Sequence, residues 1–275
     1  YYQPEAYVPT TDTYIEKDLQ INEEVDRLRL KATSTLLSGR RDIIMVATVS
    51  CIYGMGNPED YKAGIIRIKK SQVIARSELL FRLVDSLYNR TESDLQRGNF
   101  RVKGDSLDIF PPYLQTGLRI VFFGNEIESI DEIEISSGKR INSMDYAAIF
   151  PANLYVAPKD KLNTILNTIE DEMFAQKKYF ESEKKYLESK RIEERTQFDL
   201  EMIRELGYCS GIENYSRFFD GRAKGTRPFC LLDYFPDDYL MVIDESHVTL
   251  PQIKGMWGGD RARKMNLVQF GFRLP

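Results

Sequence analysis

An acidic pair near the end of the chain has the residue types that metal-assisted nucleotide hydrolysis requires. Asp244 and Glu245 follow the apolar run 240–243 and precede Ser246 and His247, the only histidine of the chain. Such a run is long enough for a buried parallel strand, and open α/β sheets bind ligands at the carboxyl ends of their strands. Asp244 would then hold Mg²⁺ through water, and Glu245 would orient or deprotonate the water that attacks a γ-phosphate. The alternative is a strand that ends in a solvated acidic turn.

The other half of such a site is missing from the sequence. A nucleotide site of this type needs a glycine-rich loop that ends in Gly-Lys-Ser/Thr, whose amides and lysine hold the phosphates. The chain contains no such loop, and the nearest candidates, 221–226 and 258–261, have the wrong spacing. The chain begins at Tyr1 and stops at Pro275, directly after Gly271-Phe272-Arg273-Leu274. We therefore interpret it as an internal piece of a longer protein that carries half of an ATPase site.

Composition favours a soluble intracellular protein with two or three domains. The chain has 275 residues, of which 42% are hydrophobic and 29% charged. Its longest apolar run, 43–53, is too short to cross a bilayer, which takes about 20 residues. Cys51, Cys209 and Cys230 are too few and too scattered for a disulfide framework or a zinc site, and they suggest a reducing compartment. The cytoplasm is the expected location.

Charge is distributed unevenly along the chain. The net charge of −4 argues weakly against simple nucleic-acid binding, because non-specific affinity for DNA comes mainly from lysine and arginine. Two local segments are nevertheless basic, and each carries a single acidic residue. They contain Arg217, Arg222, Lys224 and Arg227 beside Asp220, and Lys254, Arg261, Arg263 and Lys264 beside Asp260. Either segment could contact phosphate or be an ordinary solvated loop.

Local patterns predict the elements that must position these residues. Residues 1–21 are rich in tyrosine and in turn formers, which indicates a long hairpin. From Asn22 to Gly39 apolar residues recur at helical spacing, with Arg29 beside that stripe. Residues 43–47 then form an apolar run typical of a strand.

The rest of the chain changes character twice. After a helix expected at 77–88, short strands are predicted at 100–103, 106–110, 118–123 and 127–135, separated by glycine and proline turns. They indicate a compact antiparallel domain inserted between α/β elements. Residues 158–207 are strongly helical and read as a charged helical arm.

Five sequence motifs together resemble one family, UvrB, a component of the excinuclease ABC system. They are residues 1–9, 15–18, 96–102, 207–217 and 244–249, in the family's order and over nearly the whole chain. Asp-Glu-Ser-His alone would indicate only a superfamily 2 helicase-like motor. The resemblance implies an α/β fold: part of a helicase-like P-loop motor domain with a long β-hairpin, an inserted small antiparallel β-rich domain and a helical domain.

The resemblance also implies domain limits and a function. The expected segments are a DNA-threading hairpin (1–21), a first part of motor domain 1a (22–62), an inserted UvrA-binding domain (63–152), helical domain 1b (153–227) and a second part of domain 1a (228–275). A protein of this family is loaded on damaged DNA by UvrA, the damage-scanning component of excinuclease ABC. It verifies the lesion and recruits the UvrC nuclease for nucleotide excision repair. The full-length protein would be a DNA-dependent ATPase with limited helicase activity that uses ATP and Mg²⁺. The present chain alone is expected to be inactive and to bind neither tightly.

By the same resemblance, three groups of residues have roles. The DNA-binding group is Tyr1, Tyr2, Glu5, Tyr7, Tyr14, Arg29, Tyr215 and Arg217, and the group that binds UvrA is Arg97, Arg101 and Lys103. Aromatic faces can replace base stacking without reading sequence, so stacking rather than charge would grip DNA on this acidic hairpin. Asp244 and Glu245 match the metal and water-activating carboxylates, and His247 the position that couples nucleotide state to DNA binding.

Other interpretations stay open for these residues and for the chain. Tyr7 and Tyr14 could be half-buried packing residues, the charges near Arg101 could simply be solvated, and His247 could be structural. A transcription-repair coupling factor carries a related UvrA-binding module. A non-catalytic interaction protein, with Asp244 and Glu245 as relics, is a third possibility.

Overall fold

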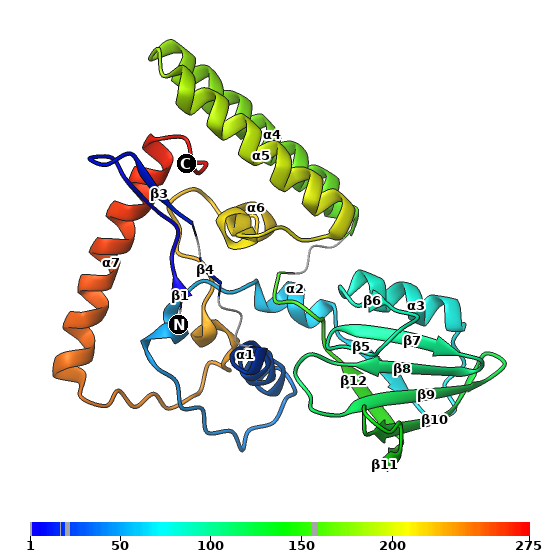
Figure 1. The fold of residues 1–275 in the computed structure, drawn as a ribbon. Helices are drawn as coiled ribbons and strands as arrows, with labels where there is room; N and C mark the ends of the chain where they lie inside the picture. Colours follow the sequence, from blue (N-terminus) through cyan, green and yellow to red (C-terminus); the bar gives the residue numbers. More distant parts are fainter. Residues whose placement is uncertain (1, 17, 20–22, 156–158) are drawn as a thin grey trace.

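Alternating apolar residues build the largest sheet of the protein. The computed structural model describes residues 2–16, 18–19, 23–155 and 159–275 (Figure 1). The sheet has the strand order β11-β10-β9-β8-β7-β6, and all neighbours are antiparallel except β6 and β7, which are parallel. Its strands are β6 (Asn89–Arg90), β7 (Asn99–Lys103), β8 (Ser106–Phe110), β9 (Gly117–Phe123), β10 (Glu126–Ile133) and β11 (Arg140–Met144).

The strands predicted from the sequence pair antiparallel, as expected, whereas the one parallel pair involves β6, which the sequence did not predict. After the loop that follows β6, β7 runs in the same direction as β6. The Asn89 N–H donates to the Gly98 carbonyl and the Thr91 N–H to the Phe100 carbonyl. Helix α3 (Arg76–Asp85) packs beside the sheet, and β5 (Ile66–Lys69) pairs with β12 (Tyr146–Ile149). The core between them contains Leu79, Leu107 and Ile120, all fully buried.

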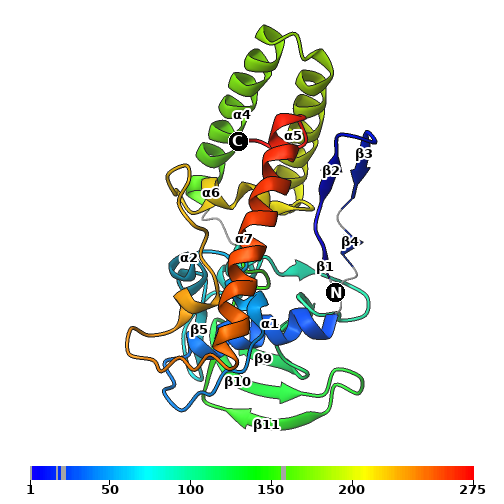
Figure 2. The same cartoon turned by 90° about the vertical axis from the view of Figure 1, so that its left-hand side faces the viewer.

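Two long helices form an elongated antiparallel pair (Figures 1 and 2). Helix α4 (Lys159–Ser182) and helix α5 (Tyr186–Leu206) pack along each other around Ile169, Met173, Phe180 and Leu200. Gly207 ends α5 at φ 73°, a left-handed conformation that glycine adopts without strain, and its N–H donates to the Ile203 carbonyl. The helical arm expected from the sequence is thus a helix pair with its own apolar core.

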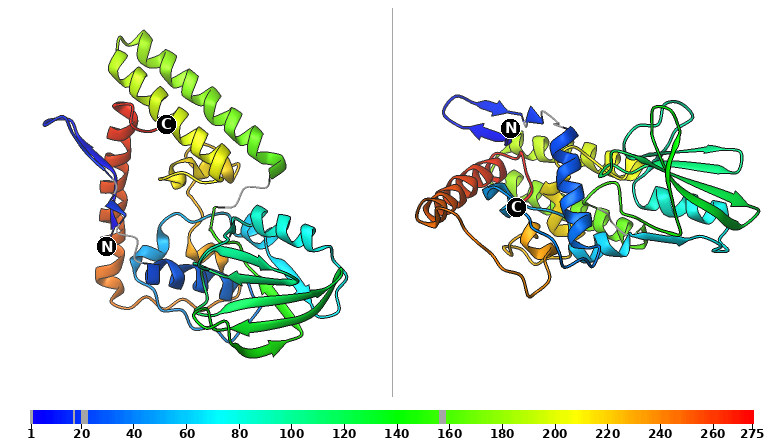
Figure 3. Two further views of the ribbon diagram at one scale, coloured as in Figure 1. Left: turned by 45° about the vertical axis from the view of Figure 1, so that its right-hand side comes forward. Right: turned by 90° about the horizontal axis from the view of Figure 1, so that it is seen from below.

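The N-terminal residues form a narrow hairpin followed by a helix. Strands β2 (Ala6–Val8) and β3 (Thr13–Ile15) pair antiparallel, and β1 (Tyr2–Gln3) pairs with β4 (Asp18–Leu19). The turn between β2 and β3 contains Asp12 at φ 47°. Figure 2 shows the hairpin standing beside α5 and α7 (Ser246–Gln269), and β2 contacts α7. Helix α1 (Glu23–Leu36) lies between the hairpin and the sheet unit (Figure 3).

A junction of short elements joins these parts. It contains the 3-10 helices η1 (Val49–Ile52), η2 (Ile212–Tyr215) and η3 (Leu231–Tyr234) and the α-helices α2 (Pro58–Ala63) and α6 (Ser216–Phe219). Tyr61 and Tyr234 are buried there and donate hydrogen bonds to the carbonyls of Pro151 and Gly56. A Cβ added to Gly56 would lie 1.8 Å from the Leu154 carbonyl oxygen, so only glycine permits this close approach of two segments.

Two predicted strands are absent. Residues 43–47 and 240–243 have no regular secondary structure, and Ile44, Val46 and Leu240 are about 90% exposed, at 93%, 93% and 89%. A strand requires neighbours that satisfy its backbone hydrogen bonds, and no described strand pairs with either run. The mixed α/β character is present, but the described residues contain no parallel motor sheet. Among the described helices, none is both long and apolar enough for a bilayer crossing.

Removing Phe180 tests whether the helix pair has a core of its own. Phe180→Ala deletes a side chain that is 1% exposed and should lower the free energy of unfolding by about 3–5 kcal/mol, because it leaves a cavity. Phe174→Ala on the same helix removes a ring that is 42% exposed and is the matched control, with a much smaller effect. Urea denaturation measures both variants, and equal losses would contradict the packing described for α4 and α5.

Candidate nucleic-acid interface

The hairpin is held by an aromatic cluster at the C-terminal end of the chain. The Tyr14 ring stacks on Phe272 with centroids 4.5 Å apart and an interplanar angle of 6°. The Tyr7 ring lies 4.8 Å from both Phe270 and Phe272. Leu267 of α7 completes this cluster. Such ring pairs contribute about 0.5–1.5 kcal/mol each beyond the area that they bury.

A buried carboxylate ties the same hairpin to α5. Glu5 is 7% exposed, and its Oε1 atom accepts hydrogen bonds from Arg195 at 2.7 Å and from the Tyr14 hydroxyl at 2.5 Å. Arg195 also donates to the Tyr14 oxygen at 2.9 Å and covers the Tyr14 ring at 4.9 Å. Arg263 of α7 donates to the Glu5 carbonyl. We call Glu5, Tyr7, Tyr14, Arg195 and Phe272 the hairpin clamp.

Arg191 extends this contact by one helical turn. It donates to the Phe270 carbonyl at 2.8 Å, and its guanidinium lies 4.1 Å above the Phe272 ring. Residues 191 and 195 are four apart and therefore share one face of α5. The C-terminal segment is thus fixed between α5 and the hairpin.

The clamp changes the acidity of the two tyrosines. Burial, reinforced by the hydrogen bond to Glu5, raises the pKa of Tyr14 to about 12. The pKa of Tyr7 is also raised, mainly because its hydroxyl donates to Asp12 at 2.7 Å. Both rings are neutral donors at physiological pH, and neither serves as an acid or base there.

The structure brings together three of the predicted DNA-binding residues. Glu5, Tyr7 and Tyr14 all belong to the clamp, so the packing alternative for the two tyrosines describes their present position. Tyr2 lies in β1, whereas Tyr1 falls outside the described residues. Stacking of these tyrosines on DNA stays a prediction, and Tyr7 and Tyr14 would first have to leave Phe272.

The other three predicted DNA-binding residues lie apart from the clamp. Arg29 is exposed on α1. Tyr215 is buried, and its hydroxyl donates to Asp199 at 2.7 Å. Arg217 pairs with Glu172 of α4 and covers the Phe218 ring at 4.0 Å. Two of these side chains therefore already have partners within the protein.

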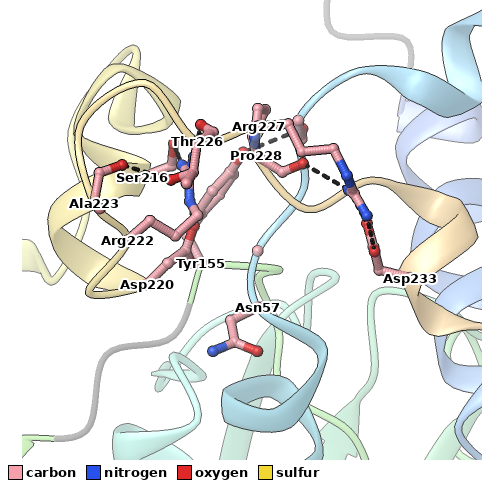
Figure 4. Close-up of polar contacts among 12 residues, drawn as sticks. Asn57, Tyr155, Ser216, Asp220, Arg222, Ala223, Thr226, Arg227, Pro228 and Asp233 are labelled. Atoms are coloured by element: carbon pink, nitrogen blue, oxygen red, sulfur yellow. Dashed lines mark hydrogen bonds and ion pairs between the residues drawn. The ribbon is translucent and has the colours of Figure 1, made fainter.

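The first basic segment is largely neutralised by its own surroundings (Figure 4). Arg222 donates to Asp220 at 2.7 Å, to the Ser216 hydroxyl at 2.9 Å and to the Thr226 carbonyl at 3.1 Å. Arg227 forms two hydrogen bonds to Asp233, at 2.7 and 2.8 Å, which lower the pKa of that carboxyl to about 2. These arginines hold loops together in the positions where the sequence allowed phosphate contact.

The acidic motif is exposed and lies just before α7. Glu245 has φ 46°, its N–H approaches Asp244 Oδ1 at 3.0 Å, and its Oε2 atom is 3.5 Å from Nδ1 of His247. All three side chains are open to solvent. In the described part of the chain no three acidic, histidine or cysteine side chains gather as metal ligands. Because the sequence also lacks a phosphate-binding loop, these residues alone do not fit a Mg²⁺–ATP complex.

The residues predicted to contact UvrA lie on or beside β7. Arg97 donates to the Leu114 carbonyl and covers the Phe110 ring at 4.8 Å, whereas Lys103 is exposed. Arg101 pairs with Asp108 at 3.4 Å. These two arginines thus have partners within the domain, and a role for any of the three in binding stays a prediction.

Arg119 was not singled out by the sequence and holds the same carboxylate. It donates to both oxygens of Asp108, at 2.6 and 2.9 Å. Burial acts to raise the pKa of Asp108, but the bonds from Arg119 and Arg101 keep it below its usual value. Residues 108 and 119 pair across β8 and β9, a contact that single-strand patterns do not reveal.

Sequence reasoning also missed Arg191, Arg195 and Phe272. The sequence indicates a charged helical arm, and this pattern predicts no contact partner for its arginines. The available signal was two arginines four residues apart on one helix face. Nothing local connected them to Phe272, which lies 77 positions after Arg195.

Comparison with known proteins identifies two segments of the chain. The family model of the UvrB interaction domain matches residues 66–155, and that of the UvrB third helical domain matches residues 160–221. The chain is 60% identical over 275 residues to UvrABC system protein B of Cytophaga hutchinsonii. It is 59% identical to that of Bacteroides fragilis and 52% identical to that of Leptospira biflexa. Each match covers 100% of this chain and 41% of the relative.

Loss of the Arg195 guanidinium should release the hairpin. Arg195→Ala leaves the buried Glu5 carboxylate without its ionic partner, at a local cost of about 1–3 kcal/mol. Amide hydrogen exchange of residues 6–15 should therefore accelerate roughly 5- to 100-fold. Lys190→Ala, on the same helix but in an exposed pair with Glu194, is the control and should leave these amides unchanged. Unchanged exchange in both variants would contradict the clamp.

The raised pKa of Tyr14 predicts that the clamp opens in alkali. A group with a raised folded-state pKa contributes stability below its unfolded pKa of about 10, and this contribution is lost as pH rises through the folded value of about 12. Hairpin amides should lose protection over that interval. Tyr14→Phe removes one of the two hydroxyls with a raised pKa and should reduce this step, which exchange at graded pH can measure.

Proposed function

Because the chain belongs to the UvrB family, we propose that it is the DNA-contacting part of a nucleotide excision repair protein that verifies bulky lesions. The family relatives carry the name UvrABC system protein B, and the chain spans about two fifths (41%) of their length. The activity, substrates and partners of the whole protein are therefore proposed for this chain as part of that protein.

The hairpin clamp is the observation that carries the proposal. Residues 8–13 at the hairpin tip are exposed, whereas Glu5, Tyr7 and Tyr14 are held by α5, α7 and the C-terminal segment. The contact consists of one ion pair, a few hydrogen bonds and ring stacking, which is small enough to open and reclose. A hairpin that opens around one DNA strand and closes again would let normal nucleotides pass and would stop at a bulky adduct.

The acidic hairpin suits a verifier that must not adhere to intact duplex. Non-specific affinity for DNA comes mainly from cationic side chains on phosphates, and this hairpin carries Glu5, Asp12, Glu16 and Asp18. Stacking on tyrosine contributes about 1–3 kcal/mol per base without reading sequence. Tyr1, Tyr2, Tyr7 and Tyr14 supply such rings in this proposal.

In the longer protein, ATP and Mg²⁺ would bind at a site to which this chain contributes only one part. Asp244 would hold the metal ion and Glu245 the attacking water, with the phosphate-binding loop supplied by residues outside this chain. His247 lies within reach of Glu245 and would relay nucleotide state. In this proposal Asp244, Glu245 and His247 belong to the P-loop motor of the parent protein.

Two protein partners complete the proposed role. UvrA would dock on the segment that matches the UvrB interaction domain, where Lys103 is exposed and Arg97 and Arg101 could contribute. UvrC would supply the nuclease. A transcription-repair coupling factor is the alternative, and the tyrosine-rich hairpin together with Asp244-Glu245 in one chain argues against it.

The proposal predicts a separation between DNA retention and nucleotide binding. In the full-length protein, Tyr2→Ala should lower UvrA-dependent retention on a duplex with one bulky adduct by about 5- to 100-fold, because one stacking face is lost. ATP binding should be unchanged. Tyr186→Ala, which removes an exposed tyrosine at the far end of the helix pair, is the matched control. Equal retention by the Tyr2 variant and the native protein would refute the stacking role.

A further inference from the structure

Helix α7 presents a continuous exposed stripe that the proposed function does not use. Its members recur every three or four residues, which places them on one face of the helix. They are Leu250, Lys254, Trp257, Arg261 and Met265, and all five are exposed. Trp257, the only tryptophan of the chain, is 65% exposed. Tryptophan is highly buried on average, so an exposed tryptophan beside cations calls for an explanation.

The stripe lies on a different side of α7 from the hairpin. Arg263 and Leu267 are four residues apart and face inward, with Arg263 on the Glu5 carbonyl and Leu267 beside Tyr7. Arg261 is two positions from Arg263, which turns it about 200° around the helix axis. The packing of the hairpin therefore leaves the stripe uncovered.

The charges of the stripe are available. Within the described residues, neither Lys254 nor Arg261 forms an ion pair, whereas Arg263 and Lys264 both pair with Asp260 at 2.6 Å. The Arg261 guanidinium lies 5.4 Å from the Trp257 ring, close enough for a cation–π contact that orients the indole. Proteins that bind single-stranded DNA without reading its sequence combine aromatic rings, which stack on bases, with cations, which contact phosphates. The stripe offers one such ring and two such cations.

Glycines beside the stripe point to close approach of a ligand. Gly255, Gly258 and Gly259 lie inside α7, where each costs about 1 kcal/mol relative to alanine. A Cβ added at any of them would meet nothing within 4 Å. Packing within the described protein therefore gives no reason for glycine here, but an open helix backbone lets a phosphate approach closely.

We propose that the outer stripe of α7 binds single-stranded DNA, separately from the hairpin. Trp257 stacks on a base, Lys254 and Arg261 each neutralise a phosphate, and the glycines admit the backbone. The contact reads no sequence. This inference rests on the proposed DNA-binding function and adds a second contact to it, on a helix that begins directly after Asp244-Glu245.

Binding of a fluorescein-labelled oligo-dT strand to the full-length protein tests the stripe. Trp257→Ala should weaken binding about 5- to 100-fold, and Trp257→Phe, which keeps a ring, should restore most of it. Arg261→Glu and Lys254→Glu should each reduce the magnitude of the salt slope by about 0.7, because one phosphate contact is lost. Gly258→Ala should weaken binding while raising helix stability. Native affinity and slope in these variants would overturn the proposal.

Tryptophan emission provides an independent readout. The emission lost on Trp257→Phe belongs to Trp257 alone, and it should be quenched by acrylamide before DNA is added and protected afterwards. Protection already without DNA would mean that another segment of the longer protein covers the stripe, and would overturn the proposal. Tyr2→Ala separates the proposed function from the stripe proposal. If adduct retention is lost in the Tyr2 variant but intact in the Trp257 variants, the proposed function stands and the stripe proposal is rejected. Retention intact in both would reject both.

Discussion

The buried carboxylate of Glu5 is the contact on which the arrangement of the hairpin depends. A carboxylate that leaves water must be paired and hydrogen-bonded, and Arg195 and Tyr14 meet both requirements. Because Arg195 belongs to α5, the hairpin cannot satisfy Glu5 without lying against the helix pair. Phe272 then fills the space beside Tyr14 and brings the C-terminal segment into the same cluster. One desolvated charge thus brings three distant parts of the chain together.

Most arginines near the candidate interface are occupied by the fold itself. Arg217, Arg222 and Arg227 pair with carboxylates, and Arg191 lies over Phe272. A protein that uses its cations internally has a weak electrostatic attraction for DNA, in keeping with the net charge of −4. In the proposed function, aromatic stacking is then the main source of grip, at the hairpin and, in our inference, at Trp257. This division would suit the proposed function, in which undamaged DNA is released.

The outcome of the sequence predictions follows from the range of the interactions involved. The predicted strands correspond to β7–β10 and the helical segment 158–207 to α4 and α5, because period and turn residues are local. Strands β11 and β12 and helix α7 were not predicted. The strands at 43–47 and 240–243 were wrong, because an apolar run becomes a strand only where a neighbour accepts its hydrogen bonds. The single parallel pair, β6 and β7, depends on the path of a loop.

The sequence by itself determined the family, the strands β7–β10, the helical character of 158–207 and the residue types that could do chemistry. Its motifs are short, contiguous and specific, so no contact had to be known. Only the tertiary structure decided which of those residues are available. Tyr7 and Tyr14 pack against Phe272, and the Tyr215 hydroxyl donates to Asp199, so these three tyrosines already have partners within the protein. Burial and pairing are relations between distant segments, and a residue's own type and neighbours along the chain do not contain them.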